Sequence, residues 1–467
     1  MKRDQVLSDS FRSAMPSSMA KLALFLLIVV AVTTARAQIT AIYDFSKTGD
    51  PQNPEVVGVI SQGHDGNMYS TAPFRVANVN LGTAFKITPG GKLTVTNSST
   101  DQIASGLTLG TDGNFYGTTD NGGTGAGTVF KLTPKGVLTT LYSFSGGNDG
   151  KQPLAPPIEG TDGNFYGTTY IGGIDNLGTA YKMTPKGKLT TCVQFNGSDG
   201  ALPVGPLVQG SDGSFYGTTQ NGVNGNYGTV FKFTSSCNFT LLHVFTSGER
   251  PDGGLVQGND GNFYGTTPLA GAHGQGLVYK ITPGGTFTDL YDFTGGTDGA
   301  NPYAGLLLAT DGNFYGVATA GGGTGFGTVY KISTGGKFVT SWAFNAFDGA
   351  SPSTPLIQNT NGTIYGDAKV GGATTNFGTF FKLDAVHLKP FVSLLPTSGK
   401  VGAQIGILGQ GLTGTTKVSF NGSSAEFTVV SDTYMTADVP AGATKGFVTV
   451  TTPGGVLKSN RKFRVTK

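Results

Sequence analysis

DGNFYGTT at residues 112–119 and GTVFK at residues 127–131 decide the fold, because related stretches recur along most of the chain. Copies of the first begin at Asp65, Asp112, Asp162, Asp212, Asp260, Asp311 and Asn361, and copies of the second at Gly82, Gly127, Gly178, Gly228, Gly276, Gly327 and Gly378. Successive copies of the first lie 47 to 51 residues apart, a period typical of one four-stranded propeller blade. The sequence therefore predicts an all-β fold with a seven-bladed β-propeller.

One repeat shows the strands expected in every blade. Alternating or aromatic-rich runs predict strands at 207–209, 215–219, 229–233 and 239–245, joined by Asp-Gly and Thr-Pro-x-Gly turns. An aspartate such as Asp112 or Asp162 is expected to accept hydrogen bonds from backbone N–H groups of its turn, and the next glycine to adopt positive φ. Calcium binding is the alternative for these acidic turns, but no DxDxDG cluster accompanies them.

The two ends of the repeat region are unequal. The last repeat stops after residues 378–383 and has no fourth strand of its own, whereas residues 38–45 match a fourth strand and precede any first strand. Pairing the early strand with the last repeat would close the ring and remove exposed sheet edges. The sequence thus favours a closed propeller over an open solenoid.

Composition narrows the class of protein. The chain has 467 residues, of which 37% are hydrophobic and 13% charged, with a formal net charge of +3. Such a charge content gives no electrostatic surface suited to nucleic acid, so no nucleic-acid partner is expected. Cys192 and Cys237 cannot form a disulfide framework or a zinc site. The simplest interpretation makes them incidental, with Cys192 a small buried hydrophobe where other repeats carry Leu141 or Leu290.

The first 37 residues have the features of an export signal. Residues 21–32 form a short apolar run behind a lysine, and Ala35-Arg36-Ala37 offers a small-x-small cleavage site. The run is short for a membrane span, so a cleaved signal peptide and no transmembrane anchor in the mature chain are expected. Translation from Met19 would give the more usual short basic segment before the apolar run.

Stretches such as DGNFYGTT, GTVFKLTP and LTTLYSF resemble the GloVer (Gloeo_Verruco) tandem repeats of secreted bacterial proteins, over residues 38–388. That resemblance implies export and varied C-terminal attachments, without an agreed activity. After a junction at Lys389-Pro390 the repeat pattern ends. Residues 389–467 resemble the IPT/TIG family, which implies an immunoglobulin-like β-sandwich; the motifs that carry this resemblance are 394–399, 405–412, 418–422, 439–440 and 448–455. Some IPT/TIG relatives contact DNA. Export and the expected lack of a basic cluster in this tail argue against that role here.

Antiparallel strands place the near-constant turns on one face of the ring and the variable connections on the other. A ligand site is expected on the variable face or at that mouth of the channel, because variable loops on a rigid scaffold often bind ligands. Candidate sugar-binding residues there are Phe74, Arg75, Asn78, Tyr227 and His273. Ordinary surface decoration is the simpler explanation for each of them.

Glu159 departs from the repeat, because other repeats carry Gln62, Gln209, Gln257 or Gln358 at its position. It is the one catalytic candidate, as an acid facing the channel; a solvated carboxylate is the simpler interpretation. The chain has no GxSxG, HExxH or P-loop motif, and no cofactor or metal is expected.

Three functions remain open at this point. The preferred hypothesis is a non-catalytic, secreted or cell-surface, monomeric binding protein for polysaccharide or another glycan. A carbohydrate-active hydrolase or lyase is the alternative, and a structural component of an envelope or matrix is the third.

Overall fold

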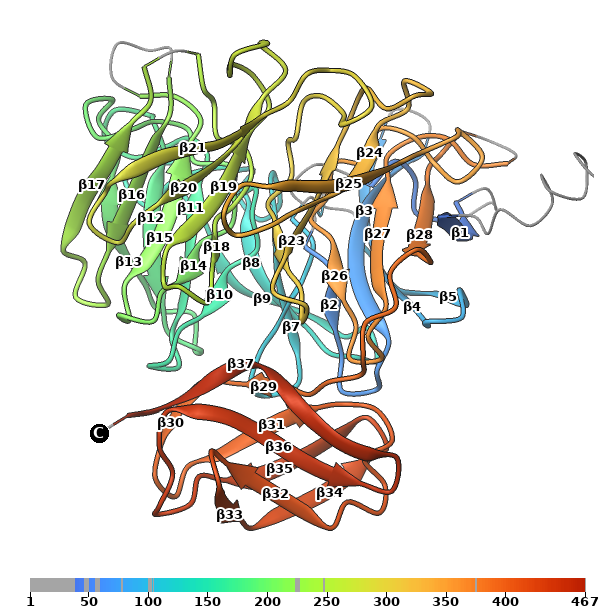
Figure 1. Cartoon of the computed structure of the whole chain (residues 1–467). Helices are drawn as coiled ribbons and strands as arrows, with labels where there is room; N and C mark the ends of the chain where they lie inside the picture. Colours follow the sequence, from blue (N-terminus) through green and yellow to red (C-terminus); the bar gives the residue numbers. More distant parts are fainter. Residues whose placement is uncertain are drawn as a thin grey trace, which may run out of the picture. The chain divides into compact units, whose positions relative to one another are not determined.

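The computed structural model describes residues 38–45, 50–54, 59–76, 79–99, 103, 105–222, 227–246, 248–373 and 376–466. All regular elements in these ranges are β-strands (Figure 1). The proposed signal peptide, residues 1–37, lies outside them. Within the described part of the chain, no helix is long and apolar enough to cross a membrane.

Between residues 39 and 383, the described strands form seven four-stranded antiparallel sheets. We number these sheets along the chain. Sheets 1 to 4 consist of β2 (Ser61–Gln62), β3 (Met68–Val76), β4 (Val79–Ile87), β5 (Leu93–Ser99); β6 (Thr108–Leu109), β7 (Phe115–Thr119), β8 (Thr128–Leu132), β9 (Leu138–Ser143); β10 (Ile158–Glu159), β11 (Phe165–Thr169), β12 (Thr179–Met183), β13 (Leu189–Gln194); and β14 (Val208–Gln209), β15 (Phe215–Thr219), β16 (Thr229–Phe233), β17 (Phe239–Val244).

Sheets 5 to 7 repeat this order. They consist of β18 (Val256–Gln257), β19 (Phe263–Thr267), β20 (Leu277–Ile281), β21 (Phe287–Asp292); β22 (Leu307–Leu308), β23 (Phe314–Ala318), β24 (Thr328–Ile332), β25 (Phe338–Ala343); and β26 (Ile357–Gln358), β27 (Ile364–Ala368), β28 (Thr379–Leu383), β1 (Ile39–Asp44). In each sheet the two-residue strand is an edge strand. This arrangement is consistent with a β-propeller.

The last of these sheets joins distant parts of the chain. Strand β1 pairs antiparallel with β28, and its register places Ile39 opposite Leu383 and Asp44 opposite Thr379 (Figure 1). The first described strand is therefore the fourth strand of sheet 7, which is the pairing that the unequal ends of the repeat region predict. It covers an edge of β28 that would otherwise be open to another chain.

The aspartate that recurs in sheets 1 to 6 organises the turn between the first two strands of the sheet. In sheet 2, one carboxylate oxygen of Asp112 accepts a hydrogen bond from the backbone N–H of Asn114 at 3.0 Å, and the other accepts one from the Tyr116 hydroxyl at 2.9 Å. Gly113 has φ of +78°, as the turn requires. The predicted turn-capping role is thus confirmed.

Aromatic rings join each sheet to the next. The tyrosine of one FYG motif, or of its MYS equivalent at residues 68–70, packs on the phenylalanine of the following motif, with ring centroids 3.6 to 4.3 Å apart in five successive pairs. The glycine of the motif leaves room for a ring from the third strand, because a Cβ on Gly217 would lie 2.6 Å from the Phe231 ring. Buried Trp342 packs into the cluster shared by sheets 6 and 7.

Seven buried apolar clusters among the described residues are each shared by two consecutive sheets. The one that contains Met68 and Phe85 of sheet 1 also contains Tyr365 and Phe380 of sheet 7. The series of sheets therefore closes on itself, and each interface buries the large apolar side chains that stabilise it.

The two cysteines form a disulfide, so the expectation that they are incidental is wrong. Cys192 lies in β13, and Cys237 lies in the turn between β16 and β17 at φ of +67°. Other repeats carry glycine at the position of Cys237. In those repeats the turn packs against the fourth strand of the preceding sheet; Gly187, for example, lies against Leu141. The repeat register therefore brings the cysteines together, with their Cα atoms 4.7 Å apart, and links sheet 3 to sheet 4.

The C-terminal region, residues 389–466, contains two further sheets. One consists of β29 (Ser393–Leu395), β31 (Gln404–Leu408), β35 (Tyr434–Asp438) and β34 (Phe427–Ser431), and the other of β30 (Ser398–Lys400), β37 (Gly455–Thr466), β36 (Gly446–Thr452), β32 (Lys417–Phe420) and β33 (Ser423–Ala425). Alternate residues of both sheets, such as Ile407 and Val450, enter one shared apolar core.

Candidate functional site

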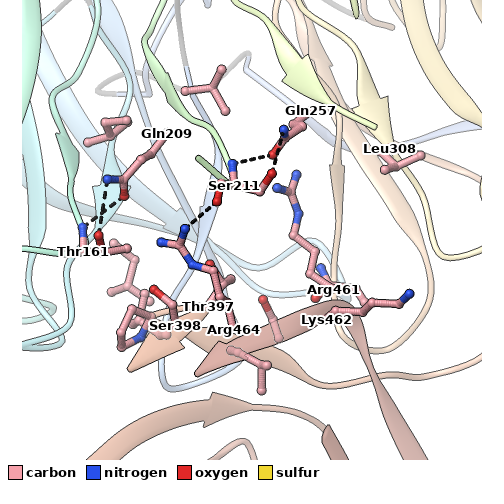
Figure 2. Close-up of a pocket in the computed structure, with 18 of the residues that line it drawn as sticks. Thr161, Gln209, Ser211, Gln257, Leu308, Thr397, Ser398, Arg461, Lys462 and Arg464 are labelled. Atoms are coloured by element: carbon pink, nitrogen blue, oxygen red, sulfur yellow. Dashed lines mark hydrogen bonds between the residues drawn. The ribbon is translucent and has the colours of Figure 1, made fainter. Parts of the chain in front are cut away.

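The two-residue strands line a cavity of about 990 Å³ (Figure 2). All seven sheets contribute to it through the first strand or its flanking residues, and residues of the C-terminal region complete the lining. The wall contains aliphatic side chains such as Ile158, Val208 and Leu307. Two hydroxyl groups in this wall donate hydrogen bonds to the backbone of the next sheet. Ser61 donates to the Leu107 carbonyl at 2.7 Å, and Thr108 donates to the Pro157 carbonyl at 2.5 Å.

Amide side chains at the ends of these strands fasten neighbouring sheets together. The Gln209 side-chain oxygen accepts a hydrogen bond from the Thr161 backbone N–H at 3.0 Å, and its amide nitrogen donates to the Thr161 hydroxyl at 3.3 Å. We call this arrangement the glutamine clamp. Equivalent clamps join further pairs of sheets; they are Gln257 to Ser211, Gln358 to Thr310 and Gln62 to Thr360.

Glu159 occupies a clamp position and also lines the cavity. One of its carboxylate oxygens accepts a hydrogen bond from the Thr111 backbone N–H and the other accepts one from the Thr111 hydroxyl, both at 2.7 Å. The catalytic candidate from the sequence is thus a half-buried carboxylate that joins sheet 3 to sheet 2 in the way that glutamine does elsewhere.

The C-terminal region meets the turns of sheets 1, 4 and 7. The ring of Tyr434 stacks on His64 with centroids 3.6 Å apart, and the Thr433 hydroxyl donates to the His64 carbonyl at 2.6 Å. Arg464 donates a hydrogen bond to the carbonyl of Ser211 (Figure 2). Burial lowers the pKa of His64, although Asp65 and Asp112 act in the opposite direction.

Positive charge gathers around the cavity. Lys445, Arg461, Lys462 and Arg464 line it, whereas Glu159 and Asp260 are its lining carboxylates in the described chain. The prediction that the tail lacks a basic cluster is wrong, because β37 carries three of these cations and the loop before β36 carries the fourth. The run KSNRKFR at residues 458–464 was the available signal. Its cations are spread along one strand, and the sequence did not indicate that this strand faces a cavity.

Arg461 differs from the other cations. Figure 2 shows its side chain pointing toward the sheet ends that carry Ser211 and Gln257. Among the described residues, no carboxylate lies within ion-pairing distance of its guanidinium, which also has no hydrogen-bond partner there. Burial lowers the pKa of this group. The hydroxyl of buried Ser398, which lines the same cavity, also has no hydrogen-bond partner among the described residues.

The remaining sequence candidates do not line this cavity. Phe74 and Arg75 lie in β3, and Asn78 falls outside the described residues. Tyr227 is half-buried before β16, and His273 is exposed in the loop before β20. Phe74 and Arg75 thus belong to the second strand of sheet 1 and not to a loop, and Tyr227 and His273 belong to connections between second and third strands. The cavity is instead lined by first strands, by Asp-Gly turns such as those near Ser211 and Asp260, and by the C-terminal region. The described cavity therefore lies at the near-constant turns and not at the variable connections.

The family model of the Gloeobacter/Verrucomicrobia repeat matches residues 62–252 and 245–429. The chain belongs to this repeat family. The second match runs beyond residue 388, where the sequence pattern places the end of the repeats. No curated protein matches the chain.

Among solved structures, the chain is similar to a gluconolactonase from Xanthomonas campestris, with 10% sequence identity and a TM-score of 0.40 over 71% of this chain and 96% of that chain. It is also similar to PorZ, a bacterial surface component of the type-IX secretion system of Porphyromonas gingivalis. That similarity has 14% identity and a TM-score of 0.47, over 90% of this chain and 60% of that chain.

Proposed function

We propose that this member of the repeat family is a non-catalytic binding protein of the cell exterior. In this proposal a glycan occupies the cavity that is lined by the two-residue first strands of the sheets, which we call the inner strands. In this proposal residues 1–37 are a signal peptide cleaved near Ala37, residues 38–388 form a seven-bladed β-propeller, and residues 389–467 form an IPT/TIG sandwich. The disulfide between Cys192 and Cys237 fits an oxidising, extracytoplasmic location.

The cavity is the observation that carries the proposal. Ligand sites in proteins are concave spaces of about 300–1,000 Å³, mostly apolar, with a few polar groups that orient the ligand. The space here, about 990 Å³, combines aliphatic walls with the side-chain oxygens of the glutamine clamps and the Arg461 guanidinium. The amide oxygens can accept further hydrogen bonds and the guanidinium can donate them, which suits the hydroxyl groups of a sugar.

The lining carboxylates support binding over hydrolysis. A glycosidase places two carboxyl groups across the scissile bond, one as acid and the other as base or nucleophile. Glu159 is held by Thr111, and Asp260 accepts hydrogen bonds from the Tyr264 hydroxyl at 2.8 Å and the Asn262 side chain at 2.7 Å. Both carboxylates thus have structural partners, which favours a binding role for the cavity. Hydrolysis with Glu159 as the catalytic carboxyl group is the alternative proposal.

The variable connections remain a second proposed site. Tyr227 and His273, with Phe74, Arg75 and Asn78, would stack on or hydrogen-bond to a sugar there. Binding at these loops would leave the cavity empty, so the two sites can be separated by substitution.

The test is to incubate the mature chain with plant, fungal and bacterial polysaccharides, measuring retention of the protein and release of reducing ends together. Retention without release is expected. Release that Glu159→Gln abolishes would establish the hydrolase instead, and neither retention nor release would favour a structural component of the envelope or matrix.

A further inference from the structure

Arg461 places a positive charge at the cavity without a compensating negative charge in the described chain. Removing a charge from water is costly unless a partner of opposite sign replaces the lost hydration. Folded proteins normally pair such a group, and Asp311 with Lys331 at 2.8 Å shows that this chain does so elsewhere. The open partner position beside Arg461 is therefore suited to an anion.

The neighbouring cations are either bound to other groups or exposed. Arg464 is bound to the Ser211 carbonyl, and the ammonium of Lys462 lies 5.7 Å from the centroid of the Phe447 ring. Lys445 and Lys462 are exposed and raise the potential at the mouth without fixing a ligand. Arg461 combines a half-buried side chain, placement in the cavity lining and a guanidinium without a partner in the described residues.

We propose that the cavity binds an acidic saccharide, whose carboxylate pairs with the Arg461 guanidinium. This inference rests on the proposed glycan-binding function and adds the class of glycan. A guanidinium presents a planar set of donors that matches a carboxylate with two parallel hydrogen bonds. The N–H groups of the clamp amides are already engaged, but their side-chain oxygens can accept hydrogen bonds from the hydroxyl groups of the same sugar.

A free inorganic anion would satisfy the same guanidinium, but it would leave most of the cavity unfilled. A sulfate ion has five heavy atoms, whereas the lining extends from the sheets to the C-terminal region and includes Phe391 and Phe447. Aromatic and aliphatic walls favour a ligand that also buries carbon. The saccharide is therefore the better match to the cavity.

The experiment is isothermal titration of the full mature chain with oligogalacturonate, with the neutral oligogalactan of equal length and with sodium sulfate. Oligogalacturonate is expected to bind at least 10-fold more tightly than either of the others. Arg461→Gln should weaken its binding by about 10- to 100-fold, the range expected for a charge-assisted hydrogen-bonded pair. Arg461→Lys, which keeps the charge but loses the planar fork, should give an intermediate loss.

The matched control is Lys417→Gln, which removes the same charge from an exposed position on β32 that does not line the cavity. It should bind within about twofold of the parent chain, and thermal midpoints of all variants verify folding. Equal binding of the acidic and neutral oligosaccharides, unaffected by Arg461→Gln, would overturn the inference while leaving glycan binding intact. Sulfate binding as tight as that of oligogalacturonate would also overturn it. Failure of every polysaccharide to retain the chain would contradict the proposed function itself.

Discussion

Gln62 and Thr360 join the first sheet to the last. The Gln62 side-chain oxygen accepts a hydrogen bond from the Thr360 backbone N–H, and the Gln62 amide nitrogen donates one to the Thr360 hydroxyl, both at 2.8 Å. The two residues are 298 positions apart in the sequence. Both side chains are buried. This pair is the ring-closing copy of a contact that also joins neighbouring sheets.

The clamp explains a coupled substitution within the repeats. The residue that directly follows the first strand of a sheet is usually a glycine, such as Gly160. Wherever the next residue along the chain is Thr or Ser, the following sheet carries Gln or Glu at the clamp position. Where that next residue is His64 or Asn259, the following sheet carries Leu109 or Leu308. The amide is present only where a hydroxyl can pair with it, because an unpaired buried amide would destabilise the interface.

We expect Gln209→Leu to lower the free energy of unfolding by about 1–2 kcal/mol, because Thr161 loses its partner. Adding Thr161→Asn reproduces the natural Asn259 and Leu308 pair and should restore part of the loss. Urea denaturation of the parent, both single variants and the double variant measures the coupling. Strictly additive effects would show that the two residues do not act as a pair.

Reduction of the disulfide should lower the free energy of unfolding by about 2–4 kcal/mol, since Cys192 and Cys237 close a loop across two sheets. Replacing Cys237 alone with Ser leaves a side chain at positive φ and should be at least as damaging. Cys192→Leu with Cys237→Gly copies the other repeats and should recover stability relative to Cys237→Ser. Thermal midpoints with and without reductant test this, and a parent chain insensitive to reductant would contradict it.

Asp367 should make the fold less stable at high pH. Burial raises its pKa to about 7, against a hydrogen bond from Thr354 that acts in the other direction. The unfolded chain releases this proton near pH 4. Stability therefore falls as pH rises from about 4 to about 7 and stays reduced above that. Asp367→Asn should gain about 2–4 kcal/mol at pH 8 and little at pH 4. An equal effect at both pH values would rule out titration as the cause.

His64 should have the opposite pH dependence. Burial holds its pKa below the value in the unfolded chain, so protonation favours unfolding as pH falls below about 6.5. His64→Phe keeps a ring to stack on Tyr434 and should remove this acid-sensitive component. Unfolding free energies of parent and variant at pH 7.5 and 5.5 provide the measurement. A difference between parent and variant that does not change with pH would assign His64 a packing role alone.

The repeats predict much of the fold because each element carries a local signal. Phe215–Thr219 and Thr229–Phe233 form strands as expected, and β1 takes the place of the missing fourth strand. Such features follow from strand periodicity, turn chemistry and the unequal ends of the array. They do not require knowledge of distant side-chain contacts.

The candidate site could not be predicted in the same way. Glu159 differs visibly from the repeat, but its engagement by Thr111 depends on a contact between sheets. Arg461 lies in a tail without internal repeats, and only the three-dimensional structure brings that tail to the inner strands. Cys237 carried a signal, because it replaces a glycine of the turn, but its partner was visible only through the register of two sheets.

Hydrogen–deuterium exchange of the mature chain, with and without saturating oligogalacturonate, tests the central claim that the cavity is the ligand site. The account predicts slower exchange at the inner strands β10, β14 and β18 and at residues 445–464. Protection confined to the connections that contain Tyr227 and His273, or no protection anywhere, would contradict it.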